Sequence, residues 1–245
     1  MTPERIAELH RAALEGLLGA GPRSTPPGRP PAPASIAGRI EHTLLSTAAS
    51  DDDVRRVCRE AEQHAFRAVC CLPRDVAPCR RLLDGTSSLV VTVVDFPLAQ
   101  GGASAAEAEC LRAVAAGADE IDMVIDVRAV RGGDLEAAAA GVRRVVAAAD
   151  GRPVKVILET ALLSDEQIVA AAAAAEAGGA SYVKTSTGYS TRGASAADIR
   201  ILRAAVGERL GIKASGGIKD RAAADALIAA GADLIGTSNG PKCAS

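Results

Sequence analysis

Residues 182–217 read YVKTSTGYSTRGASAADIRILRAAVGERLGIKASGG, in which two short apolar runs enclose a segment with apolar residues at helical spacing. This pattern predicts a strand, a helix and a second strand. One lysine lies in each apolar run, Lys184 in the first and Lys213 in the second. Because burying an unpaired ammonium group is strongly unfavourable, two such lysines in neighbouring strands indicate a site.

The same strand–helix unit recurs along the chain from Ile40 onward. Eight short apolar runs alternate with helical patterns, and only GPKCAS follows the last run. Strict alternation of strand and helix favours right-handed crossovers and a parallel sheet. Eight units predict an α/β fold of the TIM-barrel type, (β/α)₈, with a truncated last helix. The pattern alone leaves a doubly wound open sheet as an alternative.

The segment before the first repeat divides into two parts. Residues 1–20 carry apolar side chains at helical spacing and predict an extra N-terminal amphipathic helix. We expect it to cap one end of the barrel, and a dimer contact is the alternative. Residues 21–35, GPRSTPPGRPPAPAS, are rich in proline and predict an extended linker. Residues 36–245 are then expected to form a single barrel domain, which suits the length of the chain.

Composition argues against several classes of function. Charged residues make up 24% of the chain, the formal net charge is −2, and acidic and basic residues are interleaved. Neither a basic patch nor an aromatic-rich stretch indicates a nucleic-acid partner. The six cysteines form no CxxC pair, which argues against a zinc site and a disulfide framework. Without a signal-peptide pattern or an apolar run of membrane-spanning length, we expect a cytoplasmic protein with no membrane partner.

Polar residues on otherwise apolar strands identify the candidate site. Alternate residues of a strand face the same side, and active sites of this fold lie at the carboxyl ends of the strands. We expect Asp122, Lys155, Lys184 and Lys213 to point inward from the fourth to the seventh strand, with Asp126 on the same face as Asp122. A buried structural ion network would use the same residue types. Charges converging from four consecutive strands favour a functional site instead.

Neighbouring ammonium groups predict a particular chemistry. Lowering a lysine pKa from about 10.4 to near 7 requires roughly 4 to 5 kcal/mol. A second ammonium group about 4 Å away supplies about 4 kcal/mol at an effective dielectric constant near 20. Because a neutral amine attacks carbonyl carbon, the pair predicts a Schiff-base enzyme. Each lysine should lower the pKa of the other, so this reasoning leaves open whether Lys184 or Lys213 is the nucleophile.

Glycine-rich segments follow the last three predicted strands. They are TSTG, ASGG and GTSNG. Glycine lets backbone amides approach an anion closely, and loops after the seventh and eighth strands of this fold commonly bind phosphate. We therefore expect a phosphorylated small molecule as the ligand. The candidate residues are Gly188, Gly216, Gly217, Gly236 and Ser238.

Together these motifs resemble those of the deoxyribose-phosphate aldolase family. VKTSTG around Lys184, KASGGI from Lys213, GADEIDMVI around Asp122, VKVILET and the closing GTS occur in the family's order and spacing. The resemblance runs from about Ile40 to Gly240. It implies a class I aldolase that reversibly cleaves 2-deoxy-D-ribose 5-phosphate to D-glyceraldehyde 3-phosphate and acetaldehyde. It also implies that no metal or other cofactor is needed.

The resemblance implies roles for individual residues. Lys184 corresponds to the Schiff-base lysine and Lys213 to the lysine that lowers its pKa. Asp122 corresponds to the carboxylate that moves protons together with a water molecule. The four glycines and Ser238 named above correspond to the phosphate pocket. Supporting roles are expected for Glu41, Lys155 and Thr185.

Three departures from the family pattern leave alternative functions open. Glu41 stands where the family has aspartate, Asp95 replaces a glycine after the third strand, and no tyrosine follows the last strand. Asp95 is expected at the barrel mouth, facing the incoming phosphate. The alternatives are another Schiff-base barrel enzyme and a descendant that binds a sugar phosphate without catalysis. A homodimer is expected, because homo-oligomers are common for such barrels.

Overall fold

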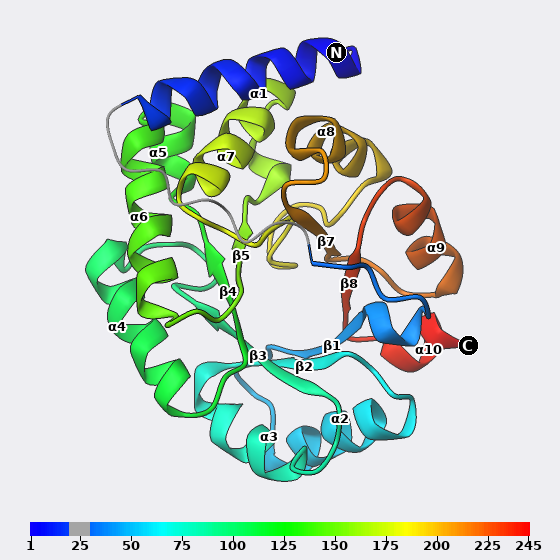
Figure 1. The fold of residues 1–245 in the computed structure, drawn as a ribbon. Coiled ribbons are helices and arrows are strands. Elements are labelled where there is room, and N and C mark those ends of the chain that lie inside the picture. Colours follow the sequence, from blue (N-terminus) through cyan, green and yellow to red (C-terminus); the bar gives the residue numbers. More distant parts are fainter. Residues whose placement is uncertain (20–29) are drawn as a thin grey trace.

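The computed structural model describes residues 1–19 and 30–245. Eight parallel strands pair in chain order, and β1 also pairs with β8, so the sheet closes into a barrel (Figure 1). This closure confirms the predicted TIM barrel and excludes the open sheet. The strands are β1 (Ile40–Leu44), β2 (Ala68–Cys71), β3 (Leu89–Val94), β4 (Glu120–Val124), β5 (Val154–Ile157), β6 (Tyr182–Lys184), β7 (Gly211–Ser215) and β8 (Leu234–Thr237).

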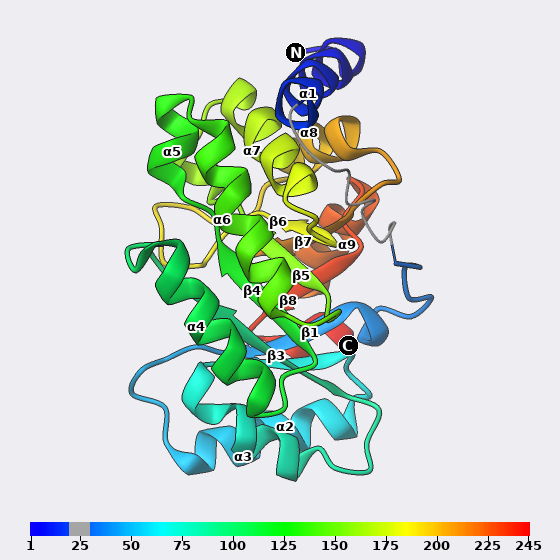
Figure 2. The same ribbon diagram turned by 60° about the vertical axis from the view of Figure 1, so that its left-hand side comes forward.

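Helices surround the barrel, as the two views in Figures 1 and 2 show. Ser50 and Ser164 begin α2 and α7 with capping boxes, in which the serine side chain and the third helical residue satisfy each other's backbone amides. The last helix has five residues, as the short C-terminal sequence predicted. The helices that follow strands are α2 (Asp51–Gln63), α3 (Val76–Leu82), α4 (Gly102–Ala115), α6 (Leu135–Ala148), α7 (Asp165–Ala177), α8 (Ala196–Val206), α9 (Arg221–Ala229) and α10 (Gly240–Ala244). Short 3₁₀ helices are η1 (Ala37–Arg39), η2 (Pro73–Asp75) and η3 (Thr160–Leu162).

One additional helix, α5 (Val127–Gly132), lies between β4 and α6 and was not predicted. Strand β4 ends at Val124, so the alternation of inward and outward residues stops before Asp126. Asp126 instead begins α5, and its carboxylate accepts hydrogen bonds from the backbone amides of Arg128 and Ala129 at 2.9 and 3.0 Å. The expectation that Asp126 shares the inner face with Asp122 is therefore wrong.

The N-terminal helix α1 (Pro3–Leu18) forms where the sequence predicted a helix, and Thr2 provides its N-cap. It packs on the outside of α7 and α8, so it extends the helical layer and does not cover an end of the barrel (Figure 1). His10 of α1 is buried there, with its Nε2 3.2 Å from a carboxylate oxygen of Glu176 on α7. Residues 21–29 of the predicted linker (residues 21–35) lie outside the described residues. Residues 30–35 form no helix or strand.

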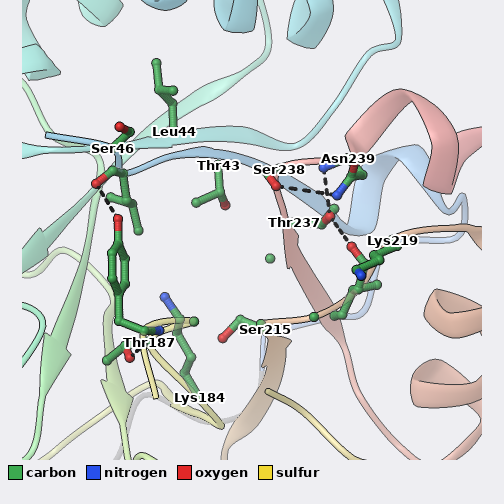
Figure 3. A pocket seen from close by; sticks show the side chains of 17 residues that line it. Thr43, Leu44, Ser46, Lys184, Thr187, Ser215, Lys219, Thr237, Ser238 and Asn239 are labelled. Atoms are coloured by element: carbon green, nitrogen blue, oxygen red, sulfur yellow. Dashed lines mark hydrogen bonds between the residues drawn. The ribbon is translucent and has the colours of Figure 1, made fainter. Parts of the chain in front are cut away.

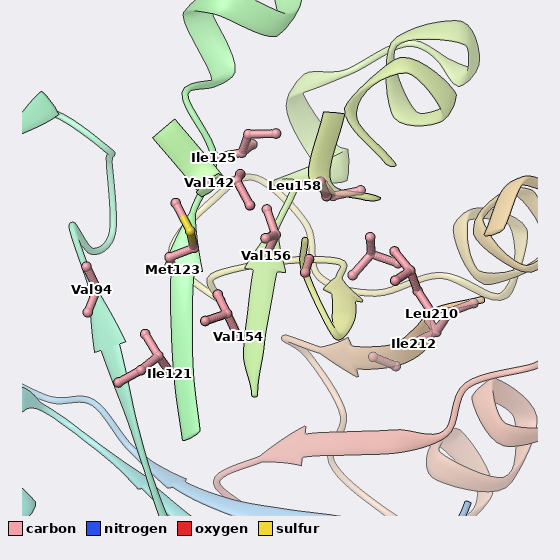
Figure 4. Packing of buried hydrophobic residues seen from close by; sticks show 14 of the residues in the cluster. Val94, Ile121, Met123, Ile125, Val142, Val154, Val156, Leu158, Leu210 and Ile212 are labelled. Atoms are coloured by element: carbon pink, nitrogen blue, oxygen red, sulfur yellow. The ribbon is translucent and has the colours of Figure 1, made fainter. Parts of the chain in front are cut away.

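Alternation along the strands creates two different environments. Outward-facing side chains such as Ile121, Val156 and Ile212 pack against the helices in one continuous core (Figure 4). Each fully buried aliphatic side chain of this kind contributes about 1.5–3 kcal/mol. Inside the barrel, Cys70, Val91 and Val93 belong to a smaller apolar cluster on the β2–β3 side. The buried charged side chains Glu41, Asp122, Lys155, Lys184 and Lys213 come from other strands, namely β1 and β4 to β7.

Candidate active site

The strand register brings the predicted lysines together. Lys184 on β6 lies directly opposite Lys213 on β7, and Asp122 on β4 lies opposite Lys155 on β5. All four side chains point into the barrel and are at most 2% exposed. The sequence-based prediction that these four residues converge therefore agrees with the structure.

Asp122 is at the centre of this cluster. Its Oδ2 accepts hydrogen bonds from the Nζ atoms of Lys184 and Lys213 at 2.7 and 2.6 Å, and its Oδ1 accepts one from Lys155 Nζ at 3.1 Å. Burial opposes ionisation of Asp122, but the three ammonium groups outweigh burial and hold its pKa well below the usual value. Asp122 is therefore a carboxylate that contacts every buried lysine of the cluster.

Two further carboxylates and an arginine complete the cluster. Glu41 on β1 contacts Lys213, and it also contacts Lys155 at 3.3 Å and Arg67 at 2.8 Å. Glu120 on β4 contacts Lys155 and Arg67, both at 2.5 Å. Glu41 and Lys155 were predicted as supporting residues, whereas Arg67 and Glu120 were missed. Glu120 could have been found, because it lies two positions before Asp122 and shares its face of the strand.

A count of the buried charges identifies the lysine that can be neutral. The cluster holds three carboxylates and four basic groups, so its charge is balanced when one lysine gives up its proton. The carboxylates are Glu41, Glu120 and Asp122, and the basic groups are Arg67, Lys155, Lys184 and Lys213. Within the described residues, Lys155 contacts three carboxylates and Lys213 contacts two, but Lys184 contacts only Asp122. Lys184 is therefore the basic group that loses its proton most readily.

The pKa values of the two facing lysines shift in opposite directions, and these shifts also identify Lys184 as the lysine that loses its proton. Burial is the main cause that lowers the pKa of Lys184, the charge of Lys213 adds to it, and the two outweigh the opposing effect of Asp122. Burial also acts on Lys213, but the carboxylates of Asp122 and Glu41 outweigh it and raise the Lys213 pKa above its ordinary value. The pKa of Lys213 is therefore raised overall, and not lowered as a neighbouring ammonium group alone would predict. Burial, and not the neighbouring charge, is the larger effect on Lys184.

A cavity of about 410 Å³ opens above the cluster, at the carboxyl ends of β1, β6, β7 and β8 (Figure 3). Of the three buried lysines, only Lys184 lines it, while Lys155, Lys213 and Asp122 lie beneath its floor. The five predicted phosphate residues all line it, namely Gly188, Gly216, Gly217, Gly236 and Ser238. Lining residues that the prediction of the site did not include are Thr43, Leu44, Leu45, Ser46, Thr187, Tyr189, Ser215, Ile218, Lys219, Thr237 and Asn239.

The glycines serve two different purposes. Gly188, Gly216 and Gly217 have φ values of 89°, 86° and 74°, in the left-handed region where side chains are strained. Their loops can therefore turn tightly at the rim of the cavity. Gly236 has an ordinary backbone, but a Cβ atom there would lie 2.9 Å from Cε of Lys213. Gly236 thus provides space for the Lys213 side chain as well as for a ligand.

Two threonines after β6 hold the wall of the cavity. Thr185 is fully buried and does not line the cavity; its hydroxyl donates to the carbonyl of Ser215 at 3.2 Å and accepts from the Ser215 amide at 3.1 Å. Thr187 lines the cavity, and its hydroxyl donates to Oε2 of Glu159 at 2.5 Å. Thr185 therefore joins the end of β6 to β7, and its supporting role in the reaction stays a prediction.

Asp95 does not face the cavity. It follows β3 with a φ of 51°, and its carboxylate accepts a hydrogen bond from the Gly101 amide at 2.8 Å within its own loop. It is absent from the residues that line the cavity. The expectation that Asp95 opposes an incoming phosphate is corrected, because its charge is engaged in shaping the loop after β3.

The described residues show no sign of two other kinds of site. Residues 1–19 and 30–245 contain no group of three or more histidine, cysteine, aspartate or glutamate side chains arranged to hold a metal ion. In the same residues no helix has the length and apolar character needed to cross a membrane.

Comparisons with known proteins agree with this geometry. A family model described as DeoC/LacD family aldolase matches residues 38–243. A deoxyribose-phosphate aldolase of Geobacillus sp. is 44% identical over 84% of this chain and 93% of its own, and that of Thermotoga maritima is 43% identical over 84% of both chains. The structure of a tetrameric deoxyribose phosphate aldolase from Aeropyrum pernix superimposes with a TM-score of 0.81 and 32% identity, covering 97% of this chain and 96% of that one. This chain therefore belongs to the DeoC/LacD family of aldolases.

Proposed function

We propose that this protein is a class I aldolase that reversibly cleaves 2-deoxy-D-ribose 5-phosphate to D-glyceraldehyde 3-phosphate and acetaldehyde. The observation that carries the proposal is the position of Lys184. Its amine has a lowered pKa, lines the cavity and lies 2.7 Å from the carboxylate of Asp122. A neutral amine beside a carboxylate is the arrangement that Schiff-base formation requires.

The reaction begins when Nζ of Lys184 attacks C1 of the open-chain sugar. The resulting carbinolamine loses water to give an imine, and Asp122, with a water molecule, accepts and returns the protons of these steps. Asp122, acting through the same water molecule, then accepts the proton of the C3 hydroxyl, and the C2–C3 bond breaks. Its electron pair moves into the C1–C2 enamine, and glyceraldehyde 3-phosphate leaves. Protonation at C2 and hydrolysis of the imine release acetaldehyde and restore Lys184.

The glycine-rich rim is suited to the phosphate of this substrate. The loops after β7 and β8 contribute Gly216, Gly217 and Ser238, and Lys219 adds a positive charge to the same wall. Backbone amides, a hydroxyl and an ammonium group are the donors that bind phosphate. The volume of about 410 Å³ lies within the usual range for cavities that bind small molecules.

The substitution of Glu41 for aspartate is compatible with catalysis. Its carboxylate contacts Lys213, Lys155 and Arg67, so the longer side chain keeps its place in the charge cluster. A descendant that only binds a sugar phosphate would not require the lowered pKa of Lys184. The geometry therefore favours an active enzyme.

Reductive trapping tests the proposal. Incubation with acetaldehyde and borohydride, followed by peptide mass analysis, should place an added ethyl group on Lys184. Lys184→Arg should abolish both trapping and cleavage, because guanidinium remains protonated and cannot add to a carbonyl. Lys242→Arg, an exposed residue of α10, is the matched control and should behave as wild type. A label on Lys213 or Lys155 with Lys184 unmodified would overturn the assignment.

We also propose that the protein acts in the cytoplasm, in the breakdown of deoxyribonucleotides, and that it forms a homodimer. The description of the Aeropyrum pernix relative as tetrameric supports self-association within this family. Sedimentation velocity over a range of concentrations separates monomer, dimer and tetramer.

A further inference from the structure

A second cavity of about 300 Å³ lies on the same face of the barrel as the candidate active site. Its walls come from the segments after β3, β4, β5 and β6, whereas the first cavity lies at the ends of β1, β6, β7 and β8. Thr187 and Tyr189 line both cavities. The mouth of the barrel is thus divided into two chambers that share one wall.

Tyr189 forms this shared wall. Its hydroxyl donates a hydrogen bond to the carbonyl of Leu45 at 2.8 Å, which joins the segment after β6 to the segment after β1. Its ring meets Phe96 edge to face, with the ring centroids 5.5 Å apart. Contacts at both the hydroxyl and the ring hold the side chain in place, although it is 59% exposed.

Apolar side chains gather around the second cavity. Leu98 is 65% exposed, Leu162 is 43% exposed, and both line the cavity together with Tyr189. Among the described residues only six large hydrophobic side chains are exposed, so half of them border this one cavity. Exposed apolar surface that is gathered in one place marks a binding site more often than single exposed residues do.

Three charged side chains of the cavity have polar atoms without the partners that such atoms usually have. Arg128 and Arg131, both exposed on α5, line one side, and neither guanidinium has a carboxylate partner in residues 1–19 and 30–245. Glu159 lines the inner end and is 4% exposed. Its Oε2 binds Thr187, but its Oε1 is buried without a hydrogen-bond partner. Buried carboxylate oxygens are normally paired, so this oxygen requires a donor.

We propose that the second cavity is a binding site for a small amphipathic organic anion. Its carboxylate would pair with Arg128 and Arg131, its apolar body would contact Leu98 and Leu162, and a hydroxyl at the opposite end would donate to Glu159. Guanidinium groups bind carboxylates through charge-assisted, often bidentate hydrogen bonds, so the negative end of the ligand belongs on the arginine side.

Titration with 4-hydroxyphenylacetate tests the proposal, because this probe carries all three features. Binding is measured by saturation-transfer NMR on the full-length protein, with inorganic phosphate present to fill the first cavity. The wild type should bind the probe, and phosphate should not displace it. The double substitution Arg128→Ala, Arg131→Ala should weaken binding by about tenfold or more, as the loss of charge-assisted hydrogen bonds predicts.

Two controls separate charge recognition from general effects. Arg11→Ala, Arg200→Ala removes two exposed arginines from α1 and α8, outside the cavity, and should leave binding unchanged. The neutral analogue 4-hydroxyphenylacetamide should bind more weakly than the acid. Equal binding by both arginine variants, displacement by phosphate, or no wild-type binding at millimolar concentrations would each overturn the proposal. Lys184→Arg should retain probe binding, so failure of the aldolase assignment is distinguished from failure of this one.

Discussion

Replacing Lys213 by methionine removes a buried positive charge next to Lys184 while keeping a side chain of similar length. In the wild type, both ammonium groups contact the same oxygen of Asp122, at 2.7 Å for Lys184 and 2.6 Å for Lys213. After the substitution three carboxylates face three basic groups, so the cluster is balanced only when Lys184 is protonated. Lys213→Met should therefore raise the pKa of Lys184.

The structure sets the magnitude of this effect. The shared contact with one oxygen places the two nitrogens no more than about 5.3 Å apart. At that separation and an effective dielectric constant near 20, the repulsion between two ammonium groups is about 3 kcal/mol. This energy corresponds to about two pKa units. At a pH well below the new pKa, the neutral fraction of Lys184 should fall by about 100-fold.

The assay is the rate at which acetaldehyde and borohydride modify Lys184, measured between pH 6 and pH 10. This rate follows the neutral amine directly and does not depend on the later steps of cleavage. For Lys213→Met it should be about 100-fold below wild type near neutrality and should rise about tenfold per pH unit in alkaline buffer. Lys213→Arg retains the charge and is the matched control, while thermal melts confirm that each variant is folded.

A profile for Lys213→Met that lies at the same pH as wild type would refute the reasoning. It would mean that burial alone, which is already the largest cause of the lowered Lys184 pKa, determines the nucleophile. A uniform loss at every pH, without alkaline recovery, would show that Lys213 positions Asp122 and does not tune the Lys184 pKa.

Three further outcomes can be measured. Gly236→Ala places a Cβ atom 2.9 Å from Cε of Lys213. The free energy of unfolding should therefore fall by about 1–3 kcal/mol, which lowers the melting temperature, and kcat should fall as well. Ser238→Asp should raise KM for 2-deoxyribose 5-phosphate by about tenfold, because about 1.4 kcal/mol of repulsion between the new carboxylate and the phosphate has that effect. An equal rise in KM for 2-deoxyribose would contradict phosphate binding at Ser238. Neighbouring cations hold the pKa of Glu120 at about 2, below the usual 4.5, despite burial. Glu120 therefore stabilises the fold above about pH 4.5, and its contribution of about 3 kcal/mol is lost as the pH falls toward 2. In the wild type the midpoint of urea unfolding should decrease as the pH falls from 4.5 toward 2, and in Glu120→Gln it should decrease less. An equal decrease in both proteins would assign the acid sensitivity to other groups.

Local patterns in the sequence predicted the eight strand–helix units and the centre of the charge cluster, but left an open sheet as an alternative to the barrel. Strand and helix differ in hydrophobic period, and a lysine or aspartate within an apolar strand is visible as an exception to that period. Asp122, Lys184 and Lys213 could be found in this way. The alternation of inward and outward residues could not be extended past the end of a strand, because Asp126 follows β4 but is the N-cap of α5. The six residues of α5 are too few for a helical period to be recognised.

Loops were less predictable than strands, because the direction of a loop side chain depends on contacts that the sequence does not show. Asp95 was recognised as an additional charge, but its hydrogen bond to Gly101 turns it toward its own loop. Tyr189 was not recognised at all, because its partner Leu45 lies 144 residues earlier in the chain. The division of the barrel mouth into two chambers follows from such distant pairs.

The different protonation of the two facing lysines also depends on distant residues. In the sequence Lys184 and Lys213 are equivalent, since each ends a short apolar run and precedes small or hydroxyl residues. In the barrel both contact Asp122, but only Lys213 also contacts Glu41, which lies 172 residues away in the sequence. Glu41 therefore removes the symmetry of the pair. Its carboxylate helps raise the pKa of Lys213, whereas the pKa of Lys184 is lowered. Glu41 thus supports the proposal that Lys184, which lines the cavity, is the nucleophile.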